Sequence, residues 1–128
     1  MTSDRVQRLR FLPGHFAVTL DERGGTPPGD EWLALVRGPE GLTVIRPAAP
    51  GDREQWRALY SGDTAHDLDV PGMLNAVLTP LARAAVPVFV ASTFHADLVL
   101  VPVEQSDRAA EVLRAAGHHV TTAEPGDH

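Results

Sequence analysis

The sequence predicts an α+β fold in which two helices cover one face of an antiparallel sheet. Three observations support this prediction: short runs of strand-forming residues separated by glycine and proline turns, a change to helical periodicity at Gly72, and a second helical segment that begins at Ser106. From residue 56 onward the predicted elements follow the order β, α, β, β, α, β. This order is the split βαβ arrangement of the ferredoxin-like fold.

The second part of the chain contains all the elements of this order. The predicted strands span residues 56–60, 86–93, 97–103 and 118–122, and the predicted helices span residues 72–85 and 106–116. In the first helix, one apolar stripe at helical spacing consists of Leu74, Val77, Leu78, Leu81 and Ala85. Pro80 lies inside this helix, where it removes one backbone hydrogen bond, so we expect a local bend.

The first part of the chain repeats some of these elements. Strands are predicted at residues 16–20, 33–36 and 42–45, and the turn Gly38-Pro39-Glu40-Gly41 joins the last two into a hairpin. Residues 33–47 align on residues 89–103 without a gap, turn on turn, which indicates a tandem duplication whose first unit has lost most of its first helix. Because residues 47–52 break the chain, we predict a degenerate N-terminal unit at 1–52 and a complete domain at 53–128.

Composition excludes several classes of function. The chain has 128 residues, 11 basic against 17 acidic, and a formal net charge of −6, which argues against nucleic acid or an anionic membrane as the main partner. Every basic residue is arginine, which excludes lysine-dependent chemistry, and cysteine is absent, which fits a reducing cytoplasm. No signal peptide is expected, because the N-terminus is polar. No membrane span is expected, because the uncharged stretches are short. No cofactor is expected either.

One motif gives the sequence a family resemblance. Asp69-Val70-Pro71-Gly72-Met73-Leu74 resembles the D-x-P-G-x-L signature that opens the first helix of ACT domains, which are small regulatory modules that bind amino acids. Pro-Leu-Ala at 80–82, the run at 86–101 and Ala-Gly-His at 116–118 follow in matching order. This longer string resembles small tandem ACT proteins related to the aspartokinase regulatory region and to the arginine-sensing CASTOR proteins. The segment at 62–72 is longer than in that subfamily.

The resemblance and the residue chemistry together suggest a ligand site. A free amino acid presents a carboxylate, which suits backbone amides at a helix start, and Gly72 admits it because glycine has no Cβ. Hydroxyls at a strand end and the carboxylate of Asp97 suit the ligand's other groups, and Phe94 would form an apolar wall. The candidate ligand-binding residues are Asp69, Pro71, Gly72, Met73, Leu74, Ser92, Thr93, Phe94 and Asp97. Alternatively, Pro71 and Gly72 serve only as a helix start, and Asp97 serves only as a turn residue.

Metal and catalytic sites have weaker support in the sequence. His66, Asp67 and Asp69 lie in one loop, and His95 stands two residues before Asp97, but neither group has a strong ligand spacing such as H-E-x-x-H. Ser92 is not in a G-x-S-x-G motif, so a hydrolase is not expected. We therefore expect no bound metal and no enzymatic activity.

These observations predict a non-enzymatic, cytoplasmic regulatory protein that binds a small ligand, with a free amino acid as the leading candidate. We expect a homodimer, because the resemblance to ACT domains implies that two copies pair through the edges of their sheets or through their helices. The alternative is a structural or protein-interaction module that has the ACT fold without a functional pocket. An enzyme built on the loop at 66–69 is a third and more distant hypothesis.

Overall fold

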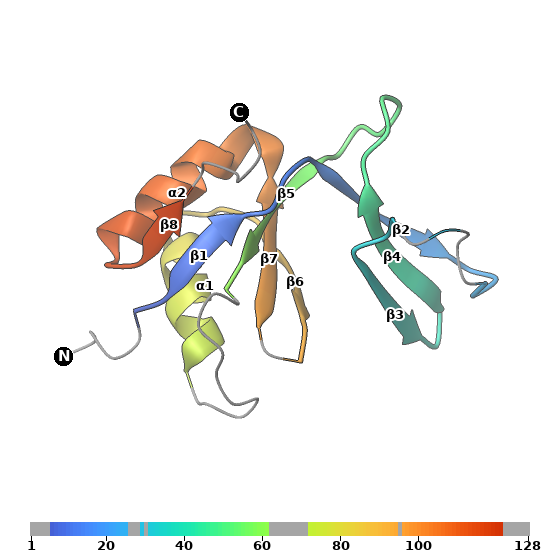
Figure 1. The fold of residues 1–128 in the computed structure, drawn as a ribbon, viewed down its shortest axis with the longest axis horizontal. Coiled ribbons are helices and arrows are strands. Elements are labelled where there is room, and N and C mark those ends of the chain that lie inside the picture. The colour runs from blue at the N-terminus through green and yellow to red at the C-terminus, as the bar shows by residue number, and fades with distance from the viewer. Residues whose placement is uncertain (1–5, 26–28, 30, 62–71, 95, 122–128) are drawn as a thin grey trace. The chain divides into compact units, whose positions relative to one another are not determined.

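The computed structural model describes residues 6–25, 29, 31–61, 72–94 and 96–121. The strands in this part of the chain are β1 (Arg8–Phe11), β2 (Phe16–Asp21), β3 (Ala34–Gly38), β4 (Gly41–Pro47), β5 (Trp56–Tyr60), β6 (Phe89–Ser92), β7 (Asp97–Pro102) and β8 (His119–Thr121) (Figure 1). The helices are α1 (Met73–Arg83), the short 3-10 helix η2 (Val103–Gln105) and α2 (Ser106–Ala115). The chain forms two compact units: Met1–Pro13 with Arg57–His128, and Gly14–Trp56.

The larger unit contains the predicted βαββαβ series and one additional strand. The order β5, α1, β6, β7, α2, β8 along the chain confirms the prediction of a mixed α+β fold. Strand β1 is additional and lies between β5 and β8, antiparallel to β5, where Arg10 is opposite Tyr60, and parallel to β8, where Leu9 is opposite Val120. On the other side of β5 the sheet continues with β7 and then β6. The resulting order is β8-β1-β5-β7-β6.

Both helices of the larger unit pack on one face of its sheet. The buried core cluster consists of Leu9, Phe11, Leu59, Val77, Leu81, Val86, Val99, Val101, Ala109, Ala110, Leu113 and Val120. Side chains alternate across a strand, so the pairs Leu9 with Phe11 and Val99 with Val101 each belong to a single face. Because residues of α1 and α2 belong to the same cluster, that face is the one the helices cover.

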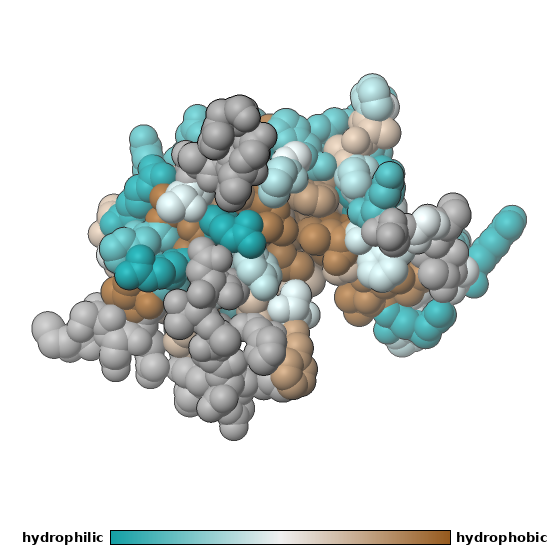
Figure 2. Space-filling model, viewed as in Figure 1, coloured by the Kyte–Doolittle hydropathy of each residue, from teal (hydrophilic) through white to brown (hydrophobic). Residues whose placement is uncertain are grey.

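Helix α1 follows the predicted apolar stripe and ends slightly earlier than predicted. Val77 and Leu81 are fully buried, and Leu74 and Leu78 pack partly against the core. Ala85 does not belong to the stripe as predicted, because the helix ends at Arg83 and Ala85 is exposed with a φ of 60°. In α2 the solvent side is polar, with Asp107, Arg108, Glu111 and Arg114 exposed, and hydrophilic surface covers this helix in Figure 2.

The smaller unit is an antiparallel sheet of β2, β4 and β3, and no helix occurs among its described residues. The predicted hairpin is confirmed, with Gly38 opposite Gly41. Gly41 has a φ of 142°, and a Cβ there would lie 2.5 Å from the carbonyl oxygen of Asp21. A larger residue at this position would therefore collide with the backbone of β2.

Strand β1 changes the division of the chain. The sequence predicts successive units at 1–52 and 53–128, whereas in the structure residues 1–13 group with residues 57–128. Arg8 and Arg10 make the N-terminal segment look polar, but they alternate with Leu9 and Phe11, which are 1% and 3% exposed. The domain assignment and the tandem duplication remain predictions. In the described part of the chain, neither helix has the length and apolarity that crossing a membrane requires.

An ion pair fixes the loop that follows β4. The Nη1 and Nη2 groups of Arg46 donate to the carboxylate of Asp52, at 3.0 and 3.2 Å. The Ala49 N–H donates to the same carboxylate at 2.7 Å. The hydrogen bond from Arg46, followed by that from Ala49, lowers the pKa of the Asp52 carboxyl. The pair therefore stabilises the folded loop at neutral pH, and this stabilisation is lost as the pH falls through the lowered pKa.

The burial of β1 predicts that the N-terminal strand is integral to the larger unit. Leu9→Ala should lower the free energy of unfolding by about 2–5 kcal/mol, because Leu9 is 1% exposed and its truncation leaves a cavity. Urea unfolding measures this change. Leu20→Ala is the matched control, since Leu20 is 46% exposed and its truncation should cost less than about 1 kcal/mol. Equal effects of the two substitutions would mean that β1 is not part of the core.

The ion pair after β4 predicts a specific titration. Carbon-13 NMR should place the titration of the Asp52 carboxyl below the ordinary value of 3.8. In Arg46→Gln the titration should move back toward that value, because the strongest donor to the carboxylate is gone. An identical titration in both proteins would show that Arg46 does not hold this carboxylate in solution.

Candidate functional site

Helix α1 begins at a glycine with unusual backbone geometry. Gly72 is the N-cap residue with φ 81° and ψ −3°, a left-handed conformation that side chains with a Cβ rarely adopt. The Ala76 N–H donates to the Gly72 carbonyl at 3.0 Å, which closes the first turn. Gly72 has no side chain to cap the helix, and the first turn contains no acidic residue. The helix start therefore presents backbone without a covering Cβ. Asp69 and Pro71 lie outside the described residues.

The next two predicted residues are engaged within the fold. The carbonyl of Met73 accepts a short hydrogen bond from the side-chain amide of Gln7, which is 5% exposed and directly precedes β1. The side chain of Leu74 packs against the core cluster. The start of α1 is thus connected to the N-terminal strand on one side and to the core on another.

The predicted polar residues of the β6–β7 hairpin form a local network. Ser92 Oγ donates to the Asp97 carboxylate at 2.8 Å, and the Thr93 N–H donates to the Ala96 carbonyl at 2.7 Å. Phe94 is 71% exposed at the end of this hairpin, where hydrophobic surface is visible in Figure 2. The hairpin therefore positions Asp97 in a fixed turn and leaves an aromatic ring at the surface.

Ser61 is a member of this network that the sequence analysis missed. It follows β5 and is 4% exposed. Its N–H donates to the Asp97 carbonyl at 3.1 Å, and its Oγ accepts the Asp97 N–H at 3.0 Å. The backbone of Asp97 is thus held by β5 while its carboxylate is held by Ser92. A small polar residue directly after a predicted strand was the available signal.

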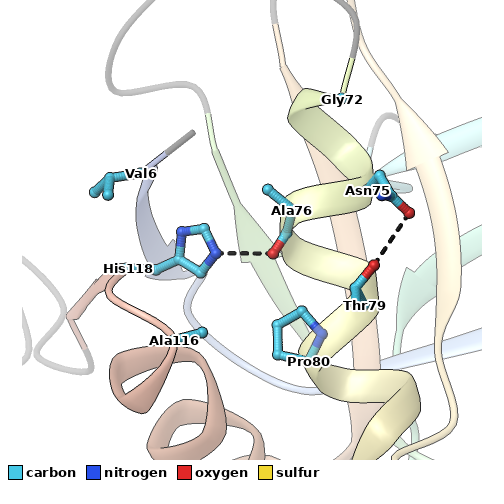
Figure 3. Close-up of a pocket in the computed structure, with 8 residues that line it drawn as sticks. All are labelled: Val6, Gly72, Asn75, Ala76, Thr79, Pro80, Ala116 and His118. Carbon is cyan, nitrogen blue, oxygen red and sulfur yellow. Dashed lines mark hydrogen bonds between the residues drawn. The ribbon is translucent and has the colours of Figure 1, made fainter. Parts of the chain in front are cut away.

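A pocket of about 450 Å³ lies along the exposed side of α1 (Figure 3). The lining includes Gly72 at the helix start and Asn75, Ala76, Thr79 and Pro80 within the helix. Successive turns of the helix contribute these positions at a spacing of three or four residues, which places them on one side of the helix. The Thr79 hydroxyl donates to the Asn75 side-chain oxygen at 3.1 Å.

The opposite wall of the pocket comes from the N-terminal segment and the turn between α2 and β8. Val6, Ala116 and His118 form this wall (Figure 3). His118 is 7% exposed, and its Nε2 lies 2.9 Å from the Ala76 carbonyl oxygen, while its Nδ1 accepts the Gln7 N–H at 3.1 Å. The described lining residues carry no formal charge when His118 is neutral. The pocket therefore offers hydrogen-bonding groups and small apolar side chains.

The structure relates the predicted residues in two groups. Gly72, Met73 and Leu74 open α1, and of the described predicted residues Gly72 also lines the pocket. Ser92 and Asp97 are hydrogen-bonded to each other in the hairpin. No hydrogen bond among the described residues joins the two groups, so their convergence on one ligand remains a prediction.

The other pocket residues were not predicted from the sequence. Asn75 and Thr79 lie on the polar side of an amphipathic helix, where polar residues usually face solvent. Their spacing beside Gly72 was the one available signal. His66, Asp67, Asp69 and His95 lie outside the described residues, and within the described part of the chain no group of three potential metal ligands is found.

Comparison with known proteins identifies one domain and supports the fold. Residues 53–115 match the family model of the ACT domain. The fold is similar to the crystal structure of Atu0741 from Agobacterium tumefaciens, with a TM-score of 0.79 and 22% identity over 96% of this chain and 98% of that chain. It is also similar to VC0802 from Vibrio cholerae, a protein of unknown function described as a possible transport protein (TM-score 0.70, 20% identity, 85% and 89% covered). No curated protein sequence matches the chain.

Proposed function

We propose, from the premise that residues 53–115 form an ACT domain, that this chain is a regulatory protein that binds a free amino acid. ACT domains are commonly small-ligand regulatory modules. The observation that carries the proposal is the position of Gly72, which opens α1 without a Cβ and also lines a pocket of about 450 Å³. A cavity of this size is within the range of small-molecule sites.

The proposed site uses the helix start for the ligand carboxylate. Backbone N–H groups at a helix N-terminus point outward, and the helix dipole favours a negative charge there. Gly72, Met73 and Leu74 would supply these amides, and Asn75 and Thr79 add a side-chain amide and a hydroxyl on the same side of α1. By resemblance to the family motif, Asp69 and Pro71 belong to the same site.

The ammonium group of the ligand needs an acceptor. In the proposal Asp97 provides it, because its carboxylate is held in a fixed turn by Ser92 and its backbone by Ser61. Thr93 offers a hydroxyl, and the exposed ring of Phe94 offers an apolar surface for a ligand side chain. A charged acceptor at this position would discriminate amino acids from simple carboxylates.

Regulation requires that the ligand bind two states of the protein unequally. We propose that ligand binding changes the shape or association of a homodimer, and that the protein acts in the cytoplasm without catalysing a reaction or holding a cofactor. We also propose that residues 1–52 are the degenerate half of a tandem duplication of the aspartokinase-regulatory and CASTOR-like type. The alternative is a structural or interaction module that has the fold without a functional pocket. A thermal-shift screen of the twenty amino acids separates the hypotheses, because an amino-acid-binding protein should be stabilised by at least one of them and the module by none.

Gly72→Val should abolish binding of the amino acid that stabilises the protein most in that screen. The branched side chain would occupy the position that the ligand carboxylate needs. Titration calorimetry measures the affinity on protein shown by circular dichroism to be folded. Gly14→Val is the matched control, because Gly14 also has a positive φ, of 88°, and does not line the pocket. Unchanged affinity in folded Gly72→Val would mean that the helix start is not the site.

Asp97→Ala should weaken the same binding by about 1.5–3 kcal/mol, the value of a hydrogen bond to a charged group. Ser92→Ala is the comparison variant, since it removes the bond within the hairpin but keeps the carboxylate. Calorimetry on both variants separates charge from turn geometry. If the two substitutions reduce affinity equally, the carboxylate of Asp97 does not contact the ligand.

A further inference from the structure

Pro80 leaves one carbonyl of α1 without its helical partner. In an α-helix the N–H of each residue donates to the carbonyl four residues earlier, and proline has no N–H. The carbonyl that Pro80 cannot reach is that of Ala76. His118 takes the place of the missing donor, because its Nε2 lies 2.9 Å from the Ala76 oxygen (Figure 3). The histidine therefore completes the hydrogen bonding of the helix.

The other ring nitrogen of His118 holds the N-terminal segment. The Gln7 N–H points at Nδ1 across 3.1 Å. A backbone N–H can only donate, so Nδ1 must accept and cannot carry a proton. The proton of the neutral ring is then on Nε2, where it donates to Ala76. This arrangement uses both nitrogens of the neutral ring, and it is buried, since Gln7 and His118 are 5% and 7% exposed.

Gln7 is attached to two further elements. The His119 N–H donates to the Gln7 carbonyl at 2.9 Å, and the Gln7 side chain donates to the Met73 carbonyl. The residue that precedes β1 thus connects β8 with the first turn of α1. Both connections depend on the position of the Gln7 backbone, which the bond to His118 fixes on its N–H side.

The described surroundings of the ring contain few charges. The pocket residues that line the same wall and the facing helix are uncharged. Arg8 and His119 are exposed and lie opposite each other on the neighbouring strands β1 and β8. Their side chains point to the sheet face away from the helices, because the next residues, Leu9 and Val120, belong to the covered face. Arg83 lies in the last turn of α1, and Arg114 of α2 donates to the Val120 carbonyl. Asp107 and Glu111 of α2 are exposed, and the ring nitrogens contact the Gln7 N–H and the Ala76 carbonyl rather than either carboxylate.

We propose that His118 is a pH-sensitive latch: its hydrogen bond to the Gln7 N–H exists only while the ring is neutral, and it adds to the bond that the Gln7 side chain makes to Met73 of α1. Protonation adds a hydrogen to Nδ1, where it faces the Gln7 N–H, so two donors meet and that bond is lost. The bond from Nε2 to Ala76 survives protonation. Acidification that protonates the ring therefore weakens the attachment of the Gln7 segment to the helix.

The latch also forms part of the pocket wall. His118 and Val6 both line the pocket, so release of the segment that contains Val6 and Gln7 would open that wall. This consequence for ligand binding rests on the proposed function, whereas the latch itself does not. The test below is therefore carried out on the full chain without ligand.

Nitrogen-15 NMR of the histidine ring and hydrogen exchange of the Gln7 amide test the latch. At pH 8 the His118 spectrum should show a protonated Nε2 and an unprotonated Nδ1. At an acidic pH at which the same spectrum shows both ring nitrogens protonated, the protection of the Gln7 amide, corrected for the intrinsic exchange rate, should fall by roughly tenfold to a hundredfold, because a buried donor loses its acceptor. A ring protonated on Nδ1 at pH 8, or equal protection of Gln7 at both pH values, would overturn the proposal.

Two variants control for general acid effects. His118→Asn places a non-titrating oxygen near the position of Nδ1, so the protection of Gln7 should no longer depend on pH. His119→Asn removes the neighbouring exposed histidine and should behave as the unsubstituted protein. A pH dependence that persists in His118→Asn, or disappears in His119→Asn, would assign the effect to another group. Failure of every amino acid to bind at pH 8 would refute the proposed function and leave these results unaffected.

Discussion

The architecture of the larger unit depends on the burial of one face of its five-stranded sheet. Each strand presents alternate residues to that face, and two amphipathic helices are needed to cover it. Strand β1 completes this surface by placing Leu9 and Phe11 between β5 and β8. Burial of each such side chain contributes about 1.5–3 kcal/mol, which offsets much of the cost of ordering a short N-terminal strand. The N-terminal strand β1 therefore lies in the same sheet as the C-terminal strand β8.

The same burial determines what the exposed side of α1 can do. Val77 and Leu81 are fixed in the core, so the rotation of the helix about its axis is fixed as well. Residues about half a turn away, Asn75 and Thr79, must then lie on the side that borders the pocket. Pro80 falls on that side too, which places the defect in the hydrogen bonding of the helix beside the cavity. The polar character of the pocket is thus a consequence of core packing.

Periodicity predicted most of the fold because it reports local burial. The helix at Met73–Arg83 and the hairpin of β6 and β7 follow directly from apolar spacing and turn residues. Strand β1 was missed because two of its four residues are arginines and its pairing partners are far along the chain. The site divides in the same way: Gly72 belongs to a local motif, whereas the bond between Gln7 and His118 joins residues 111 positions apart. No pattern within a short window contains such a contact.

The choice of residue at position 118 follows from what α1 and β1 leave unsatisfied. The helix presents a carbonyl that needs a donor, because Pro80 has no N–H, and the N-terminal segment presents an N–H that needs an acceptor. A neutral imidazole has one donor and one acceptor on opposite sides of a rigid ring, so it satisfies both groups at once. A buried lysine or arginine offers donors alone, which would leave the Gln7 N–H unpaired. The ring meets both demands only in its neutral form, because a protonated imidazole offers two donors and no acceptor.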